Sequence, residues 1–256
     1  MKFAIHTYKM KNQFTIILSI LLAIAVLSCN KKETNSAKKN VEIVDSLPNA
    51  AIEEVSDEQE ESIPYEPNNT YPKTGNKITD FVPGNGLYEV QYQAEGDLNN
   101  DGLADIAVVL KYKENKISKR PMLLLLQNED KSYRLDKVSN ITMPVEYNDY
   151  DYKLYDTEDI SIEKGELNIN LYGGGASGTF LSQFKYIENN LVLNNMEIYF
   201  AGAGGRSGFF YDREKGEITS TETNTMREDE PTTSETSKVK KELYLFEETS
   251  ITDVFN

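Results

Sequence analysis

Apolar and polar side chains alternate with a period of two residues through much of the chain, and this pattern restricts the fold most. Between residues 88 and 94, apolar side chains occupy the even positions and Glu or Gln the odd ones. Residues 167–171 alternate Leu or Ile with Asn in the same way. Because successive side chains of a strand point to opposite faces, this alternation predicts half-buried strands.

One further segment, "DIAVVLKY" at 105–112, is apolar nearly throughout, and "MLLLLQ" at 122–127 is expected to be another strand. A continuous apolar strand is typical of a sheet covered on both faces. Polar turns such as "NEDK", "EKGE" and "REKG" separate the strand segments. The sequence therefore predicts a mainly β fold, an antiparallel meander forming a sandwich, a barrel or a partial propeller, with one or two short helical turns.

The N-terminus has the features of a secretory signal. Three lysines precede an apolar run from Phe14 to Leu27, and that run is short for a membrane span. It ends in "VLSC", whose cysteine, Cys29, is the only one in the chain. We therefore expect residues 1–28 to be a signal peptide. The true start is either Met1 or Met10, since a complete signal follows each.

"VLSC" resembles the bacterial lipobox. The resemblance implies cleavage before Cys29 and lipid attachment to its thiol. It predicts a protein of the cell envelope, anchored to a membrane through lipid, with the outer membrane as the expected location and the leaflet open.

Residues 29–75 are expected to be a disordered acidic tether. Residues 41–72 contain nine acidic side chains, no basic side chain and four prolines. Low hydrophobicity with charge of one sign does not provide the apolar burial that offsets chain entropy. Residues 76–256 would then form one β-rich domain. A mobile loop is expected at 222–238, and "KELYLF" at 241–246 is expected to supply a last strand.

Cleavage would also remove His6, the only histidine, together with three lysines. The net charge would then fall from −15 to −18. A histidine-free chain has no imidazole for Ser-His-Asp or Cys-His catalysis and no His ligands for zinc. Such an acidic balance does not favour nucleic acid as a partner. Carboxylates and oxygen ligands remain as the chemistry available.

The stretch "GDLNNDGLADIAVV" carries the strongest metal-site pattern. Counted from Asp97, it reads D-x-N-x-D-G-x-x-D. Calcium binds six to eight oxygens, and the predicted ligands are the side chains of Asp97, Asn99, Asp101 and Asp105 with the carbonyl of Leu103. The alternative is an empty polar turn, since turns use the same residue types.

The front of this pattern matches an EF-hand loop, but position twelve is Val108 where an EF-hand has glutamate, and the flanks are strand-like. A strand-flanked loop of this kind resembles the calcium loops of FG-GAP and VCBS repeats. That resemblance implies that Asp105 is a direct ligand. The pattern occurs once, so a whole propeller is not predicted. The layout also resembles Bacteroidota-type lipoproteins of unknown activity.

Two other clusters are candidate binding sites. "VEYNDYDYKLYDTED" at 145–159 interleaves four tyrosines with acids, which indicates a sugar-binding platform, a carboxylate pair, or a solvated connection. The glycine-rich loops around 175–178 and 205–208 share a GxSG core and indicate backbone freedom at strand ends, with Arg206 as an alternative anion contact.

These features predict an extracytoplasmic, calcium-stabilised binding or envelope-interaction module whose partner, protein or glycan, is open. We expect no catalytic residues. A carboxylate-dependent enzyme acting on glycans is the alternative function, and an inhibitor or immunity-type protein is a third.

Overall fold

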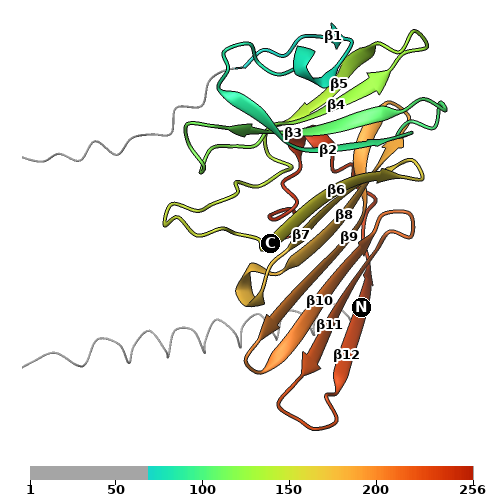
Figure 1. Cartoon of the computed structure of the whole chain (residues 1–256). Coiled ribbons are helices and arrows are strands. Elements are labelled where there is room, and N and C mark those ends of the chain that lie inside the picture. Colours follow the sequence, from blue (N-terminus) through green and yellow to red (C-terminus); the bar gives the residue numbers. More distant parts are fainter. Residues whose placement is uncertain (1–68, 256) are drawn as a thin grey trace, which may run out of the picture. The chain divides into compact units, whose positions relative to one another are not determined.

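The computed structural model describes residues 69–255 and confirms a mainly β fold built of two antiparallel sheets (Figure 1). The predicted signal peptide, Cys29 and most of the predicted tether lie outside the described residues. In the described part, neither sheet closes into a barrel. Since both sheets contribute side chains to a common core, the sandwich alternative describes the architecture best.

The five-stranded sheet has the order β1-β5-β4-β3-β2. Its strands are β1 (Thr74–Gly75), β2 (Tyr88–Gly96), β3 (Asp105–Tyr112), β4 (Met122–Gln127) and β5 (Tyr133–Ser139). The seven-stranded sheet runs from β12 to β6 in sequential order. Its strands are β6 (Thr157–Glu163), β7 (Glu166–Tyr172), β8 (Thr179–Ile187), β9 (Asn190–Gly202), β10 (Gly205–Asp212), β11 (Glu217–Asn224) and β12 (Thr232–Lys238).

The predicted burial of 105–112 on both faces is confirmed. In β3, Ala107 and Val109 enter the main core between the sheets, while Val108 and Leu110 enter a second core on the opposite face. That opposite face is covered by the segment around the 3-10 turn η1 (Ile78–Asp80), which supplies the fully buried Phe81. The two central strands, β3 and β4, are therefore buried on both faces, which explains their continuous apolar sequence.

The main core is completed by the seven-stranded sheet and the C-terminal segment. Phe184 of β8 meets Phe246 edge to face, with ring centroids 5.6 Å apart. Phe246 belongs to the 3-10 turn η3 (Phe246–Glu248). The third 3-10 turn of the described residues, η2 (Gly175–Ser177), lies between β7 and β8.

The edges of the two sheets approach closely where β2 lies against β6. A Cβ atom at Gly96 would be 2.5 Å from the carbonyl oxygen of Ile162, so only glycine fits without movement. This contact places the end of β2, and with it the start of the predicted calcium loop, beside the first strand of the second sheet.

Three predicted boundaries are corrected. Residues 69–75 belong to the fold and not to the tether, because β1 pairs with β5 through Thr74 and Gly75. The loop predicted at 222–238 is wrong in extent, since 222–224 close β11 and 232–238 form β12. β12 is exposed on both faces and rich in Thr and Ser, so no apolar alternation marked it. The predicted last strand at 241–246 is reduced to a single bridge between Val192 and Leu245.

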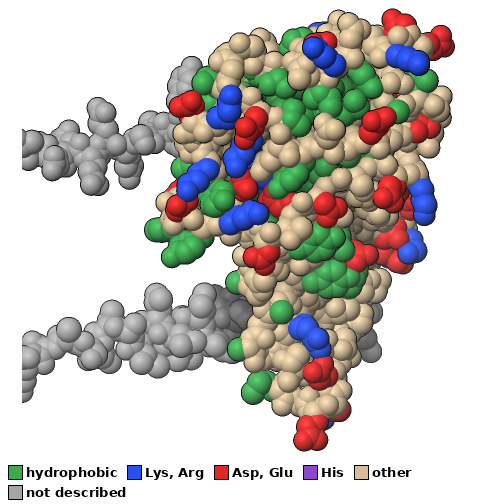
Figure 2. Space-filling view, in the orientation of Figure 1, with side chains coloured by type: hydrophobic (Ala, Val, Ile, Leu, Met, Phe, Trp, Pro, Cys, Tyr) green, Lys and Arg blue, Asp and Glu red, His purple; other side chains and the backbone are tan. Residues whose placement is uncertain are grey.

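Among residues 69–255, no helix is both long and apolar enough to cross a membrane. Figure 2 shows acidic and basic side chains interspersed on the face in view and not segregated into fields of one sign.

Candidate functional site: the acidic loop and the open sheet face

The predicted calcium loop joins β2 to β3 and curls around Asp97. The Oδ1 atom of Asp97 accepts the backbone N–H of Asp101 at 3.0 Å, and its Oδ2 accepts that of Gly102 at 3.0 Å. Gly102 has a φ of 86°, a conformation that glycine adopts at little cost. Asn99 donates from Nδ2 to Asp101 at 2.8 Å. The loop therefore brings three of the predicted ligand side chains together.

Asp105 has a different environment from the others, because it begins β3 and is fully buried. One of its oxygens accepts the backbone N–H of Leu98 at 3.0 Å and that of Asn99 at 3.3 Å. The other accepts the N–H of Gln127 at the end of β4, at 3.0 Å. Burial raises the pKa of Asp105, and these three donors oppose that rise. Asp105, at the start of β3, thus connects the loop to the end of β4.

The side-chain oxygens that would bind calcium in this loop already accept hydrogen bonds from the loop itself. Within residues 69–255, no group of three or more acidic, His or Cys side chains is arranged as a metal cluster. Each carboxylate oxygen of Asp97 and Asp101 accepts one hydrogen bond and has a second lone pair for a cation. One oxygen of Asp105, in contrast, already accepts two N–H groups. The donor set is hard oxygen throughout, which suits calcium.

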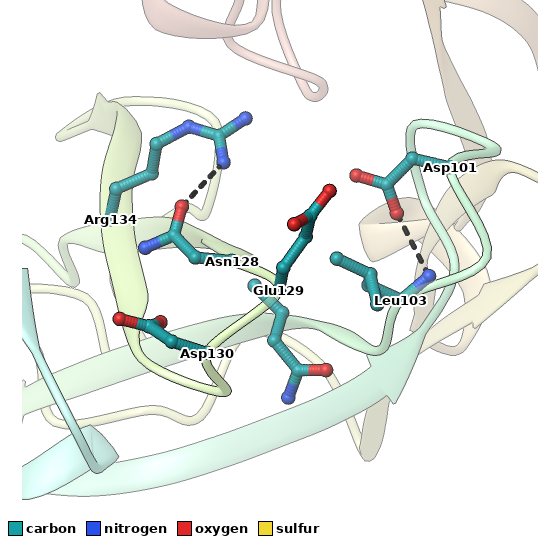
Figure 3. A pocket seen from close by; sticks show the side chains of 7 residues that line it. Asp101, Leu103, Asn128, Glu129, Asp130 and Arg134 are labelled. Atoms are coloured by element: carbon teal, nitrogen blue, oxygen red, sulfur yellow. Dashed lines mark hydrogen bonds between the residues drawn. The ribbon is translucent and has the colours of Figure 1, made fainter.

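An open pocket of about 620 Å³ adjoins this loop. Figure 3 shows Asp101 and Leu103 on one side of it and Arg134 on the other, with the Glu129 carboxylate reaching into the space between. Arg134 donates to Asn128 at 3.0 Å. Polar and charged residues make up most of the pocket's lining, and the pocket lies between the β2–β3 loop and the β4–β5 turn.

A buried ion pair lies elsewhere, at the junction of the two sheets. Arg120, just before β4, donates twice to Glu158 of β6, at 2.5 and 2.8 Å. Their side chains are 2% and 0% exposed. Arg120 also donates from Nε to the carbonyl of Pro144 at 2.7 Å. Burial and the Glu158 carboxylate raise the pKa of the neighbouring Tyr92 to about 12. This bidentate pair joins the sheets, and its role is structural.

The predicted tyrosine and acid cluster at 145–159 does not form one platform. Tyr155 is buried in the main core, and Glu158 belongs to the pair with Arg120. Glu146 is bound by Lys111 at 2.6 Å; burial would raise its pKa, but Lys111 lowers it below the ordinary value. Only Tyr150 and Tyr152, 82% and 71% exposed, remain free to stack on a ligand.

A larger exposed surface is the outer face of the seven-stranded sheet, which turns away from the main core. A row of side chains in register crosses four of its strands, from Ser161 through Asn168 and Gln183 to Asn195. Asn168 donates to Ser161 at 3.2 Å, Gln183 to Asn168 at 3.1 Å, and Asn195 to Gln183 at 3.2 Å. These three residues, here called the amide row together with Ser161, hold each amide in one orientation. Each amide donates to its neighbour on the β6 side, and Asn168 and Gln183 also accept from the next strand.

A second row on the same face carries aromatic side chains. Tyr172 of β7 and Tyr199 of β9 flank Thr179 of β8 in register and are 40% and 39% exposed. Phe210 of β10 meets Tyr199 edge to face, with centroids 5.5 Å apart. The next position in the row is Gly208, which has no side chain. Within the row, the neighbours of the two tyrosine rings are therefore small: Thr179 lies between them, and Gly208 lies beyond Tyr199.

The two glycine-rich segments meet at the end of this row, and the second one, at 205–208, forms the start of β10 and is not a loop. Both line a pocket of about 170 Å³ that Tyr199 and Thr179 also border. Gly178 has a φ of 71°, which agrees with the predicted role of backbone freedom. Arg206 lines the pocket too and forms an ion pair with Glu230.

Sequence reasoning did not find the amide row or the tyrosine row. Alternation at 166–172 identified the outward-facing residues of β7, but only the register joins them to β8 and β9. The signal that would have found them is polar amides at outward positions of successive strands.

Comparison of the chain with protein-family models, with curated proteins and with solved structures gives no match.

Proposed function

We propose that this protein is an extracytoplasmic binding module, anchored through lipid on Cys29 and stabilised by calcium in the Asp97–Asp105 loop. The observation that carries the proposal is the outer face of the seven-stranded sheet, where ordered amides and exposed tyrosines form a broad surface open to a ligand. A binding site needs fixed polar groups beside exposed aromatic area, and this face provides both.

Anchoring and binding are tested separately. The full-length chain, produced with radiolabelled palmitate in a bacterium that processes lipoproteins, should carry the label in the membrane fraction, and Cys29→Ala should lose the label, because the thiol carries the lipid. The chain from residue 29, produced without its signal, is sedimented with purified cell envelopes. We expect saturable co-sedimentation that falls at least tenfold in a Tyr172→Ala/Tyr199→Ala variant. Co-sedimentation unaffected by that pair would refute the assignment of the face, and label retained in Cys29→Ala would refute the anchor.

Calcium should raise the thermal stability of the chain from residue 29. With a dissociation constant of about 0.1–1 mM, a ligand at about 5 mM adds about 1–2 kcal/mol. For a domain of this size that corresponds to a rise of about 2–8 °C in melting temperature, reversed by a chelator. The proposed ligands are Asp97, Asn99, Asp101, Asp105 and the carbonyl of Leu103.

The matched variants for this test are Asp101→Ala and Asp130→Ala. Asp101 belongs to the loop, whereas Asp130 lines the same open pocket from the β4–β5 turn. The calcium response should vanish in Asp101→Ala and persist in Asp130→Ala. Equal melting temperatures with and without calcium in the unmodified chain would rule out the calcium site.

A further inference from the structure

We propose that the ligand of the outer sheet face is an uncharged polysaccharide lying across strands β6 to β10. This inference rests on the proposed binding function and names its ligand class. The surface concerned, here called the platform, combines the amide row, the tyrosine row and the row between them. It consists of Asp159, Ser161, Asn168, Asn170, Tyr172, Thr179, Leu181, Gln183, Asn195, Glu197, Tyr199 and Phe210.

The size of the platform suits several sugar rings. Neighbouring strands lie about 4.8 Å apart, so five strands span roughly 19 Å. Asn168 and Tyr172 are four residues apart on β7, which corresponds to about 13 Å along the strand. Tyr172 and Tyr199 are separated by one strand, so their rings stand roughly 10 Å apart with Thr179 between them. A linear chain lying across the strands would meet both rings.

The chemistry of the platform matches sugars in two ways. A pyranose has a face of C–H groups that packs on an aromatic ring, and two tyrosine rings about 40% exposed offer such area. It also carries hydroxyls that donate and accept at the ring edge. Each amide of the row has two N–H groups and two lone pairs on its oxygen. The hydrogen bonds of Gln183 within the row use one N–H and one lone pair, so its second N–H and second lone pair can bond a sugar hydroxyl.

The charge of the platform favours an uncharged polysaccharide over an anionic one. Two of the twelve platform residues are acidic, Asp159 and Glu197, and none of the twelve is Lys or Arg. Both carboxylates are fixed as acceptors: Asp159 takes the amide N–H of Asn170 at 3.1 Å, and Glu197 takes the Tyr199 hydroxyl at 2.5 Å. Beside the platform, Lys215 is paired with Asp212 and Lys238 with Glu217. Negative potential repels uronic, sulfated and phosphate-bearing polymers, while hydroxyls can donate to carboxylates.

The test is affinity electrophoresis of the chain from residue 29, produced without its signal, in native gels that contain a soluble polysaccharide. Laminarin, xylan and galactomannan serve as uncharged probes, and alginate is the anionic probe. We expect at least one uncharged probe to retard the chain and alginate not to. In Tyr172→Ala/Tyr199→Ala the dissociation constant from the retardation should rise at least tenfold. Gln183→Glu, which replaces the amide donor by an acceptor, should raise it severalfold.

Tyr150→Ala/Tyr152→Ala is the matched control, because it removes two more exposed tyrosines that lie outside the platform. It should leave retardation unchanged, and circular dichroism should show that all variants are folded. Loss of retardation in this control but not in the platform variant would place the site elsewhere and overturn the inference. So would the absence of retardation by all three uncharged probes.

The outcomes also distinguish the ligand class from the binding function. If envelope co-sedimentation depends on Tyr172 and Tyr199 while only alginate retards the chain, the function stands and the uncharged class is wrong. If neither assay depends on these tyrosines, both proposals fail.

Discussion

Replacing Glu158 by alanine should lower the free energy of unfolding by about 3–5 kcal/mol. The variant leaves the guanidinium of Arg120, 2% exposed, in the junction of the sheets without its carboxylate. Moving a charge from water into the protein interior is costly, and the bidentate partner offsets that cost in the native chain. The measurement is urea denaturation of the chain from residue 29, followed by circular dichroism.

The control for this variant is Glu217→Ala, which removes the acid of an exposed pair with Lys238. Solvent screens such a pair, so the loss should be at most about 1 kcal/mol. A double variant, Arg120→Met/Glu158→Leu, should recover most of the stability because it leaves no uncompensated charge. A loss below about 1 kcal/mol in Glu158→Ala would show that the junction relaxes or admits water.

Asp105→Ala should lower the free energy of unfolding by about 3 kcal/mol or more without calcium. Three backbone N–H groups, from Leu98, Asn99 and Gln127, lose their acceptor in a fully buried position. An unsatisfied buried donor costs about 1–3 kcal/mol, and partial rearrangement reduces the sum. The measurement is again urea denaturation, with a chelator present so that metal binding does not contribute.

Asp101→Ala is the internal comparison, because it removes another carboxylate of the same loop that is exposed. It should cost less than about 1 kcal/mol in the chelator, since the freed N–H groups reach water. The pair therefore separates two roles within one motif: Asp105 holds the loop to the strands, and Asp101 responds to calcium. Equal losses for the two variants would contradict this division.

The tyrosines and acids at 145–159 differ in burial, although their local composition is similar. Tyr150 and Tyr155 are five residues apart in the same acidic stretch, yet one is exposed and the other lies in the main core. Glu146 and Glu158 look like surface carboxylates in sequence, but each meets a cation brought in by another segment. Local composition does not encode which other segment packs against each residue. Of the three alternatives open for this stretch, a single sugar-binding platform is therefore not supported.

Alternation and turn residues, which act over a few positions, were enough to predict most of the strands. This is why the β class, the two-sided burial of β3 and the curled loop after β2 could be predicted from the sequence. Side-chain period and turn chemistry are local properties of the chain. β12 was missed because a strand exposed on both faces has no apolar face to reveal it. β1 was missed as well, and the strand expected at 241–246 is a single bridge.

The register between strands was decided only by the tertiary structure. Asn168, Gln183 and Asn195 are distant in sequence and become one row because β7, β8 and β9 pair at these positions. Arg120 and Glu158 likewise meet because β2 and β6 bring the sheet edges together. A shift of one residue in pairing would send each of these side chains to the opposite face. The candidate binding surface is therefore a property of the pairing of strands, which depends on long-range packing and not on any one segment.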